Sequence, residues 1–413
     1  MKGSPVLSHL RLLDRCFLDS DYAESYRASQ LRELLEHAHR YVPHYRPYSG
    51  LPLQAHPVLS KLVVQADRDS FLSTAFDKAK LVIRSTSGSY GLPLAYYVTQ
   101  GQNAQNYAEL VSFNRWAGFD LGMRFMFFYH LRKPGLHLVS NQVVVDPTRL
   151  NDEWLGGCVQ RIQRGDIRFV VSPPSALEAL SIYCVRNKQP LHQAGIKGVV
   201  IVSEPLDPSL QRQLEELFGC PVLGRYAAEE QGVIAHQCQH RNYHINPTRH
   251  IVEILDINED KPVMPGEIGR IILTNVSGMA MPLIRYETGD LASLGEGCPC
   301  GRKGRYFKEL VGRQVEMVTD TQGGMVMPIA ITGIIKRTLG VLQFQFVQHT
   351  STHYEAKLRV VEGFSNEGAL RANFSSVLGS DASITVSYVE EIEPLPSGKR
   401  PLVTNHANKI ARA

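Results

Sequence analysis

Short apolar runs alternate with amphipathic segments through the middle of the chain. Four of these runs predict buried strands, at 125–129, 169–171, 199–202 and 222–223. The segments between them carry apolar residues at helical spacing, as in 172–180, where two prolines stand at the start. Strands that alternate with helices predict an α/β fold with a parallel sheet and crossover helices, in which ligands gather at the strand ends.

Further elements are predicted on either side of this region. A helix followed by a loop is predicted over 21–45, and a second helix over 102–116. Toward the C-terminus, short strands at 343–348, 355–360 and 384–389 alternate with helices. This last pattern predicts a small α+β domain.

The loop 85–93 crowds hydroxyl side chains and two glycines between apolar runs at 81–83 and 94–99. Glycine tolerates positive φ and leaves room for a ligand, so the backbone N–H groups of such a loop can point into one concavity. The residues expected to hold a phosphate chain are Ser85, Thr86, Ser87, Gly88, Ser89 and Gly91. The alternative is a solvated hairpin loop. A Walker loop is excluded, because no Gly-Lys-Ser/Thr follows.

Composition narrows the function classes. A chain of 413 residues suggests two or three domains with a large core. A net charge of +4 over this length gives no basic stripe, which argues against nucleic acid as a partner. The apolar runs are far shorter than the roughly 20 residues of a membrane span. Charged residues interrupt the N-terminus, so no signal peptide is predicted and we expect a cytoplasmic protein.

Seven cysteines, an odd number, argue for free thiols or a metal site over a disulfide framework. Cys238 and His244 stand six residues apart, and Cys298 and Cys300 follow on a turn. Three thiolates and one imidazole are the ligands of a closed tetrahedral zinc site, which is structural because no position stays open for water. His236 and His240 compete with His244, and two unrelated loops with free thiols are the alternative.

Several phrases follow one another in a fixed order. They are Leu-Arg-Glu-Leu-Leu-Glu-His-Ala-His-Arg-Tyr-Val-Pro-His-Tyr-Arg (31–46), Gly-Arg-Tyr-Ala-Ala-Glu-Glu-Gln-Gly (224–232), Leu-Ile-Arg-Tyr-Glu-Thr-Gly-Asp (283–290), Val-Gly-Arg-Gln-Val-Glu (311–316) and Leu-Pro-Ser-Gly-Lys-Arg (395–400). With the loop at 85–93, this series resembles the adenylate-forming, AMP-binding (ANL) ligases. The opening phrase resembles their phenylacetate–CoA ligase branch, including its capsule-biosynthesis relatives.

The resemblance implies a role for one residue in each phrase. Tyr226 would lie against adenine, Glu230 would coordinate Mg²⁺, Arg313 would contact the ribose and phosphate side of the nucleotide, and Lys399 would act in adenylation. Asp290, expected at a turn after a polar strand, can accept two hydrogen bonds from the ribose hydroxyls. The chain departs from the family pattern at Tyr90, Ala227, Glu229 and Val315.

The resemblance also implies an architecture and a reaction. We expect a large adenylation domain with parallel or mixed sheets over 1–310, a hinge at 311–316 and a small mobile α+β lid over 317–413. A carboxylic acid would react with MgATP to give an acyl adenylate, and coenzyme A is the family's most frequent acceptor. An amine or a carrier-protein thiol is the alternative acceptor, a catalytically degenerate nucleotide- or acyl-binding protein is the alternative function, and a homodimer is left open.

Overall fold

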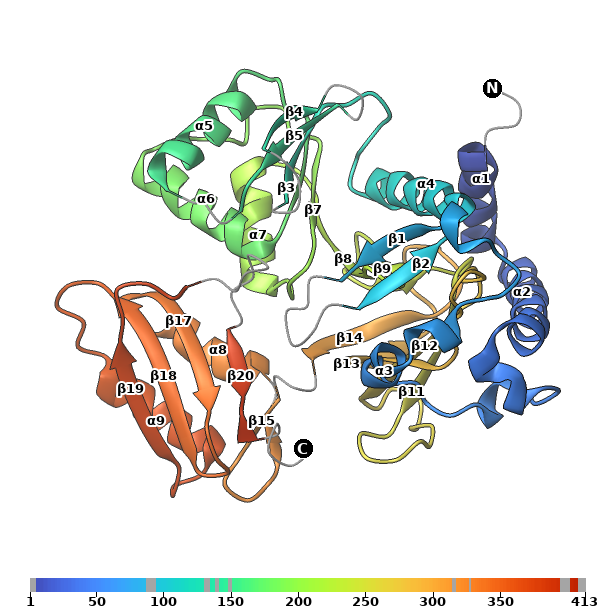
Figure 1. Cartoon of the computed structure of the whole chain (residues 1–413). Coiled ribbons are helices and arrows are strands. Elements are labelled where there is room, and N and C mark those ends of the chain that lie inside the picture. The colour runs from blue at the N-terminus through green and yellow to red at the C-terminus, as the bar shows by residue number, and fades with distance from the viewer. Residues whose placement is uncertain are drawn as a thin grey trace. The chain divides into compact units, whose positions relative to one another are not determined.

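The computed structural model describes residues 5–86, 94–129, 134–137, 141–147, 151–313, 317–326, 328–393 and 402–407. The chain forms two compact units (Figure 1). The first unit comprises Met1–Thr288 and Ala292–Glu309, and the second comprises Gly289–Leu291 and Leu310–Ala413. Among the described residues, no helix combines the length and apolar character that crossing a bilayer requires.

Twelve of the described strands join in one mixed sheet, in the order β11-β12-β13-β14-β10-β9-β8-β7-β6-β3-β5-β4. Its strands are β3 (Phe125–Phe128), β4 (Gly135–His137), β5 (Gln142–Val145), β6 (Phe169–Ser172), β7 (Gly198–Ile201), β8 (Val222–Ala228), β9 (Gly232–Gln237), β10 (Tyr243–Ile245), β11 (His250–Leu255), β12 (Gly269–Asn275), β13 (Tyr286–Gly295) and β14 (Tyr306–Arg313). The stretch β5-β3-β6-β7-β8 is parallel. The neighbouring pairs β8–β9, β9–β10, β10–β14, β11–β12 and β4–β5 are antiparallel.

Three crossover helices cover one face of the parallel strands (Figure 1). They are α5 (Asp152–Gln163), α6 (Pro174–Arg186) and α7 (Pro208–Phe218). The α7 helix begins after Asp207, whose side chain accepts hydrogen bonds from two backbone N–H groups, and ends at Gly219 with φ +64°. Their apolar side chains form the largest core together with residues such as Val170 and Val199. The alternate strand residues pack on the other face, against Trp116 and Phe119.

The N-terminal part of the first unit is mainly helical. It contains α1 (Pro5–Leu18), α2 (Ser20–Tyr41), α3 (Lys61–Ala66), α4 (Gln100–Trp116) and the short 3₁₀ helices η1 (Pro43–Tyr48), η2 (Leu53–Ala55), η3 (Arg68–Phe71) and η4 (Lys78–Lys80). A separate antiparallel pair is formed by β1 (Val82–Ser85) and β2 (Ala95–Val98). The α4 helix begins with a reciprocal capping box between Thr99 and Gln102.

The second unit is built on a four-stranded sheet in the order β19-β18-β17-β20. Its elements are β15 (Val318–Thr319), β16 (Met325–Val326), α8 (Pro328–Arg337), β17 (Val341–Gln348), β18 (His353–Val360), α9 (Glu367–Leu378), β19 (Ser383–Tyr388) and β20 (Val403–Asn405). Ile335 of α8 and Phe374 of α9 share one core with Phe346 and Tyr354 of the sheet. This unit is therefore an α+β domain.

The predicted fold class is confirmed: a large α/β unit with crossover helices and a small α+β unit. The predicted strands at 125–129, 169–171, 199–202 and 222–223 correspond to β3, β6, β7 and β8. One local prediction is wrong. Asp290 does not lie at a turn after a strand, because β13 runs from Tyr286 to Gly295 and includes it.

Candidate functional site

The predicted phosphate loop has the expected flanks. Strands β1 and β2 pair antiparallel, with Ser85 opposite Ala95. Thr86 continues the pairing, because its N–H donates to the Leu94 carbonyl (3.0 Å) and its hydroxyl accepts from the Leu94 N–H (2.9 Å). The remaining predicted loop residues, Ser87, Gly88, Ser89 and Gly91, lie outside the described residues, as does Tyr90. The Lys61 ammonium lies 3.5 Å from the Thr86 hydroxyl.

Glu230 lies in the turn between β8 and β9, and its carboxylate has a defined partner. The Tyr286 hydroxyl donates a hydrogen bond to Glu230 Oε1 (2.9 Å). The preceding carbonyl, that of Glu229, accepts a hydrogen bond from the Tyr96 hydroxyl. Because two tyrosines hold the turn and the carboxylate, Glu230 is fixed on its hairpin. It lines a small pocket together with Tyr96, Tyr97, Gln102, Asn275 and Met281.

Tyr226, predicted to lie against adenine, is a half-buried residue within β8. Its ring contacts the Phe307 ring edge to face, with centroids 5.8 Å apart. Tyr226 and Glu230 thus belong to the same hairpin. Ala227 and Glu229, two of the residues that differ from the family pattern, also lie on this hairpin, and both are exposed.

A buried ion pair supports the same turn from inside the protein. Arg249 Nε lies 3.0 Å from Glu109 Oε1, and both side chains are 2% exposed. A Cβ added to Gly232, the residue that opens β9 with φ +72°, would lie 2.7 Å from Arg249 Nη1. Glycine at position 232 therefore leaves room for the Arg249 guanidinium to lie against the backbone of the β8–β9 turn. Arg249 Nη1 also approaches the Gln231 carbonyl at 3.5 Å.

The two predicted ribose residues lie together in the second unit. Arg313 Nε is 3.8 Å from Asp290 Oδ1, and the exposed fractions of the two side chains are 40% and 15%. Asp290 follows Gly289, whose φ of +79° favours glycine. The rest of the predicted hinge, 314–316 with Val315, lies outside the described residues, and so does Lys399.

The four predicted zinc ligands converge in the first unit. One ligand atom from each of Cys238, His244, Cys298 and Cys300 lies within 4.8 Å of every other. The Sγ atoms of Cys238 and Cys298 are 3.7 Å apart, and Cys300 Sγ is 3.2 Å from His244 Nε2. Zn–S bonds of about 2.3 Å in a tetrahedron place two sulfurs about 3.8 Å apart, so the Cys238–Cys298 separation and the donor set fit a zinc site.

Neither competing histidine belongs to this cluster. His236 pairs across the sheet with His244 but stacks on Phe113 and turns Nδ1 to the Gln237 carbonyl. Burial, followed by the charge of Arg302, lowers the pKa of His244 to about 4, so its imidazole is neutral and able to bind a metal at pH 7.

The pKa values of Cys238 and Cys298 are shifted in opposite directions. Burial raises the pKa of Cys238 to about 12. Burial also opposes ionisation of Cys298, but hydrogen bonds led by the one from the Asn242 amide (3.1 Å) outweigh it and lower the pKa of Cys298.

Sequence reasoning missed three residues of these regions: Lys61, Tyr96 and Tyr286. Lys61 stands 25 residues before Thr86, and Tyr286 stands 56 residues after Glu230, so no local spacing connects them. Tyr286 does lie within the Leu-Ile-Arg-Tyr-Glu-Thr-Gly-Asp phrase, and that phrase was the available signal. Tyr96 lies in the strand that follows the predicted phosphate loop.

Comparison with known proteins connects these regions. Residues 77–281 match the model of the AMP-binding enzyme family, and residues 318–406 match the model of the CapK C-terminal domain. Protein CapK of Staphylococcus aureus is 20% identical over 371 residues, covering 85% of this chain and 79% of its own. The phenylacetate-coenzyme A ligase of Pseudomonas putida is 24% identical over 382 residues, covering 84% of each chain. That of Thermus thermophilus is 28% identical over 185 residues, 42% of this chain and 41% of its own.

Solved structures share the fold. A 2-hydroxyisobutyryl-CoA ligase in the postadenylation state superposes with a TM-score of 0.76 at 15% identity, covering 97% of this chain and 93% of its own. The same ligase in an open conformation gives a TM-score of 0.62 at 16% identity, covering 89% and 88%.

The matched AMP-binding region contains Thr86 and Glu230, and its ordered motifs continue into β13 and β14. The chain therefore contains an AMP-binding domain of the adenylate-forming (ANL) superfamily. Within that superfamily its homologues are phenylacetate–CoA ligases and CapK, which confirms the resemblance.

Proposed function

We propose that the protein is an AMP-forming acid ligase that activates a small carboxylic acid with ATP and transfers the acyl group to coenzyme A. The observation that carries the proposal is the hydrogen bond between Tyr286 and Glu230, which joins two of the family's motifs within one unit. The pairing of Asp290 with Arg313 supports it, since both come from motifs with nucleotide roles in the family. Solved ligases of the same fold carry an acyl adenylate, and one carries coenzyme A as well.

In the first step, a carboxylate oxygen of the acid attacks the α-phosphorus of ATP. The bond from that phosphorus to the oxygen bridging to the β-phosphorus breaks, and pyrophosphate leaves. Asp290 and Arg313 would hold the ribose, Tyr226 would hold the adenine, and Thr86 would contribute a hydroxyl at the phosphates. Lys399 would offset the charge that develops during transfer. Catalysis of this kind depends on positioning and charge neutralisation more than on a protein nucleophile.

Glu230 fits a role as a magnesium ligand. Its carboxylate is half-buried, and one of its two oxygens is oriented by a neutral donor, Tyr286. A hard cation takes oxygen ligands and retains several waters, so one carboxylate beside the phosphates suffices. A bound magnesium ion would supply neutralisation of the phosphate charge.

In the second step, the thiol sulfur of coenzyme A attacks the acyl carbon of the adenylate, AMP leaves, and the thiol proton goes to solvent. Between the two steps the second unit would act as a lid, with 311–316 as the hinge. We propose a structural role for zinc at Cys238, His244, Cys298 and Cys300, because four protein ligands leave no position for a reacting water.

A panel of carboxylic acids incubated with ATP and Mg²⁺ tests the proposal. Mass spectrometry should find an acyl adenylate and AMP with at least one acid, and an acyl thioester when coenzyme A is added. An amide formed with an added amine would show that the acceptor is an amine and not coenzyme A. Acylation of an added carrier protein would show that the acceptor is the carrier-protein thiol. Nucleotide binding without an adenylate for any acid would favour a degenerate binding protein.

A further inference from the structure

Arg285 has an unusual backbone for an arginine. Its φ is +51°, in the left-handed region that favours glycine, and the residue is 5% exposed. Residues other than glycine adopt this backbone conformation only where the surrounding structure enforces it, and such residues cluster at functional sites. Arg285 directly precedes Tyr286, the residue that binds the Glu230 carboxylate.

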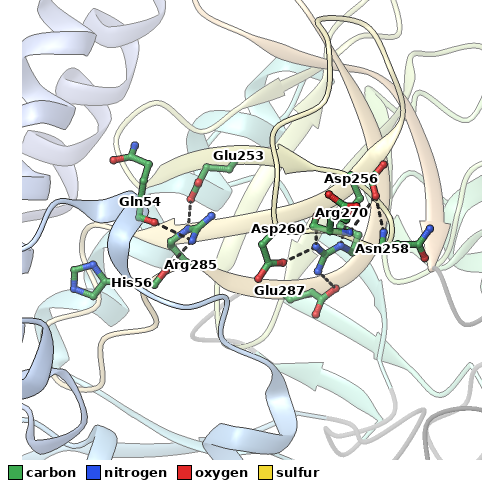
Figure 2. A network of polar contacts seen from close by, with 10 residues as sticks. Gln54, His56, Glu253, Asp256, Asn258, Asp260, Arg270, Arg285 and Glu287 are labelled. Atoms are coloured by element: carbon green, nitrogen blue, oxygen red, sulfur yellow. Dashed lines mark hydrogen bonds and ion pairs between the residues drawn. The ribbon is translucent and has the colours of Figure 1, made fainter.

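The Arg285 guanidinium is bound from two sides (Figure 2). Its Nε donates to Glu253 Oε2 of β11 (3.0 Å), and its Nη1 donates to the His56 carbonyl (2.7 Å) and approaches that of Gln54 (3.4 Å). A planar guanidinium can donate in several fixed directions at once, which the single ammonium of lysine cannot reproduce. The side chain therefore ties the segment 54–56 to the sheet.

The acceptor at His56 is itself fixed. His56 is 1% exposed, and its Nδ1 faces the carbonyls of Pro52 (3.1 Å) and Leu53 (3.2 Å). Its Nε2 faces Nε2 of His39 at 3.0 Å, with the two rings stacked. Since Nδ1 donates to a carbonyl, Nε2 accepts from His39. The His56 carbonyl is thus presented by a rigid segment.

The backbone around Arg285 is held as firmly as its side chain. Its N–H donates to the Thr274 hydroxyl (3.0 Å), and its carbonyl accepts from the Leu59 N–H (2.9 Å). The Glu287 N–H donates to the Leu59 carbonyl (2.9 Å), so Leu59 brackets Tyr286 in an isolated parallel bridge. Tyr286 therefore enters β13 with its backbone fixed on both sides.

We propose that Arg285 is a positioning residue: by fixing the backbone of Tyr286, it orients the Glu230 carboxylate for the metal–nucleotide complex. The inference rests on the proposed function of Glu230 as a metal ligand. Arg285 itself touches neither substrate nor metal in this account. Its effect must therefore pass through the Tyr286 hydroxyl, and that requirement makes the proposal testable.

The experiment measures Mn²⁺ binding by electron paramagnetic resonance in the presence of a non-hydrolysable ATP analogue. Arg285→Lys and Tyr286→Phe should each raise the dissociation constant of Mn²⁺ about tenfold, while calorimetry finds the affinity for metal-free AMP unchanged. The dissociation constant of Mn²⁺ for the double variant should also rise about tenfold, because both changes interrupt the same connection to Glu230. A rise of about a hundredfold in the double variant would mean that the two changes act independently, and this would overturn the proposal. Single variants that bind Mn²⁺ as tightly as the wild type would overturn it too.

Arg270→Lys is the matched control. Arg270 is 8% exposed, and its guanidinium binds Glu287 and Asp260 in the neighbouring network of Figure 2, without a contact to Tyr286 among the interactions described. This variant should leave Mn²⁺ binding unchanged, and an equal loss would show a general packing effect and overturn the proposal.

If Arg285→Lys does not fold, Glu253→Gln weakens the hydrogen bonding of the same guanidinium and should raise the dissociation constant of Mn²⁺ severalfold. A wild-type protein that binds no metal–nucleotide complex would overturn the proposed function and this inference together, whereas normal binding in both test variants would overturn the inference alone.

Discussion

Asp290 Oδ1 lies 3.8 Å from Arg313 Nε, and we propose that these two side chains bind the ribose side of ATP. Asp290→Ala should weaken ATP binding by about 2 to 3 kcal/mol, because two charge-assisted hydrogen bonds are lost. Calorimetry should find the affinity for the free acid unchanged. Glu287→Ala, which removes another carboxylate of β13, is the control and should bind ATP normally. An unchanged ATP affinity in Asp290→Ala would show that the Thr-Gly-Asp phrase has only a structural role.

His250 gives the folded protein a defined pH dependence. Burial, followed by the charge of Arg249, lowers the pKa of His250 well below its ordinary value, whereas in the unfolded chain it titrates near 6.5. The unfolded state therefore binds this proton first, and the free energy of unfolding falls as the pH drops below about 6.5. One proton corresponds to a slope of about 1.4 kcal/mol per pH unit. Urea titrations of His250→Gln should show a slope smaller by that amount, and equal slopes would contradict the assignment.

Residue types and their order predicted candidate positions for the chemistry, but not how those side chains are held. The carboxylates Glu230 and Asp290 stand out because their phrases resemble family motifs. Arg285 could not be predicted as a positioning residue, since its positive φ and its contacts with Gln54 and His56 exist only in the folded chain. Asp290 was misplaced because Gly289, which signals a turn, is accommodated within a strand.

The proposed zinc site joins the segment from Cys238 to His244, which leads from β9 into β10, to the loop between β13 and β14. Cys238 and Cys298 are 60 residues apart, so a shared ion would close a long loop and restrict the unfolded chain. Protein purified without added metal should contain about one zinc per chain, and a strong chelator should lower the melting temperature. Cys300→Ser should reproduce that loss. Cys220→Ser, at a partly buried cysteine outside the cluster, should not. Substantially less than one zinc per chain by elemental analysis would refute the site.

The α4 helix is joined to the segment before β11 by the ion pair of Glu109 and Arg249. Removing one partner of a buried pair leaves an uncompensated charge, so Glu109→Gln should destabilise the first unit by about 3 kcal/mol. Glu109→Leu with Arg249→Met should cost less, because no charge is left buried. Denaturant unfolding checks this order. If Glu109→Gln has the same free energy of unfolding as the wild type, the Glu109–Arg249 pair does not stabilise this part of the first unit.

Elements with continuous apolar runs were the predictable ones. Strands β6 and β7 are buried on both faces and β3 is buried on one and half-buried on the other, so their apolar sequences signal them without any partner. The antiparallel strands β9 to β12 were not predicted, because they carry polar residues that are buried in specific hydrogen bonds. Gln237 is an example: its carbonyl oxygen accepts from the Gly224 N–H (2.9 Å) and the Gln211 amide (3.1 Å).

The residues proposed for the reaction come from both units. Glu230, Tyr226 and Thr86 belong to the first unit, while Asp290 and Arg313 belong to the second, and Lys399 follows in its sequence range. An adenylation lysine contributes to a developing charge and little to folding. Lys399→Ala should therefore slow adenylate formation by about a hundredfold or more, equivalent to about 3 kcal/mol in the barrier. Binding of ATP and acyl transfer from a supplied adenylate should be retained.

Acid-dependent exchange of labelled pyrophosphate into ATP tests the central claim most directly, because it reports formation of the adenylate whatever the acceptor. We predict exchange by the wild type with at least one small carboxylic acid, strict dependence on that acid, and a loss of about a hundredfold or more in Lys399→Ala. Exchange at the wild-type rate in Lys399→Ala, or no exchange with any acid by a protein that binds ATP, would contradict the account.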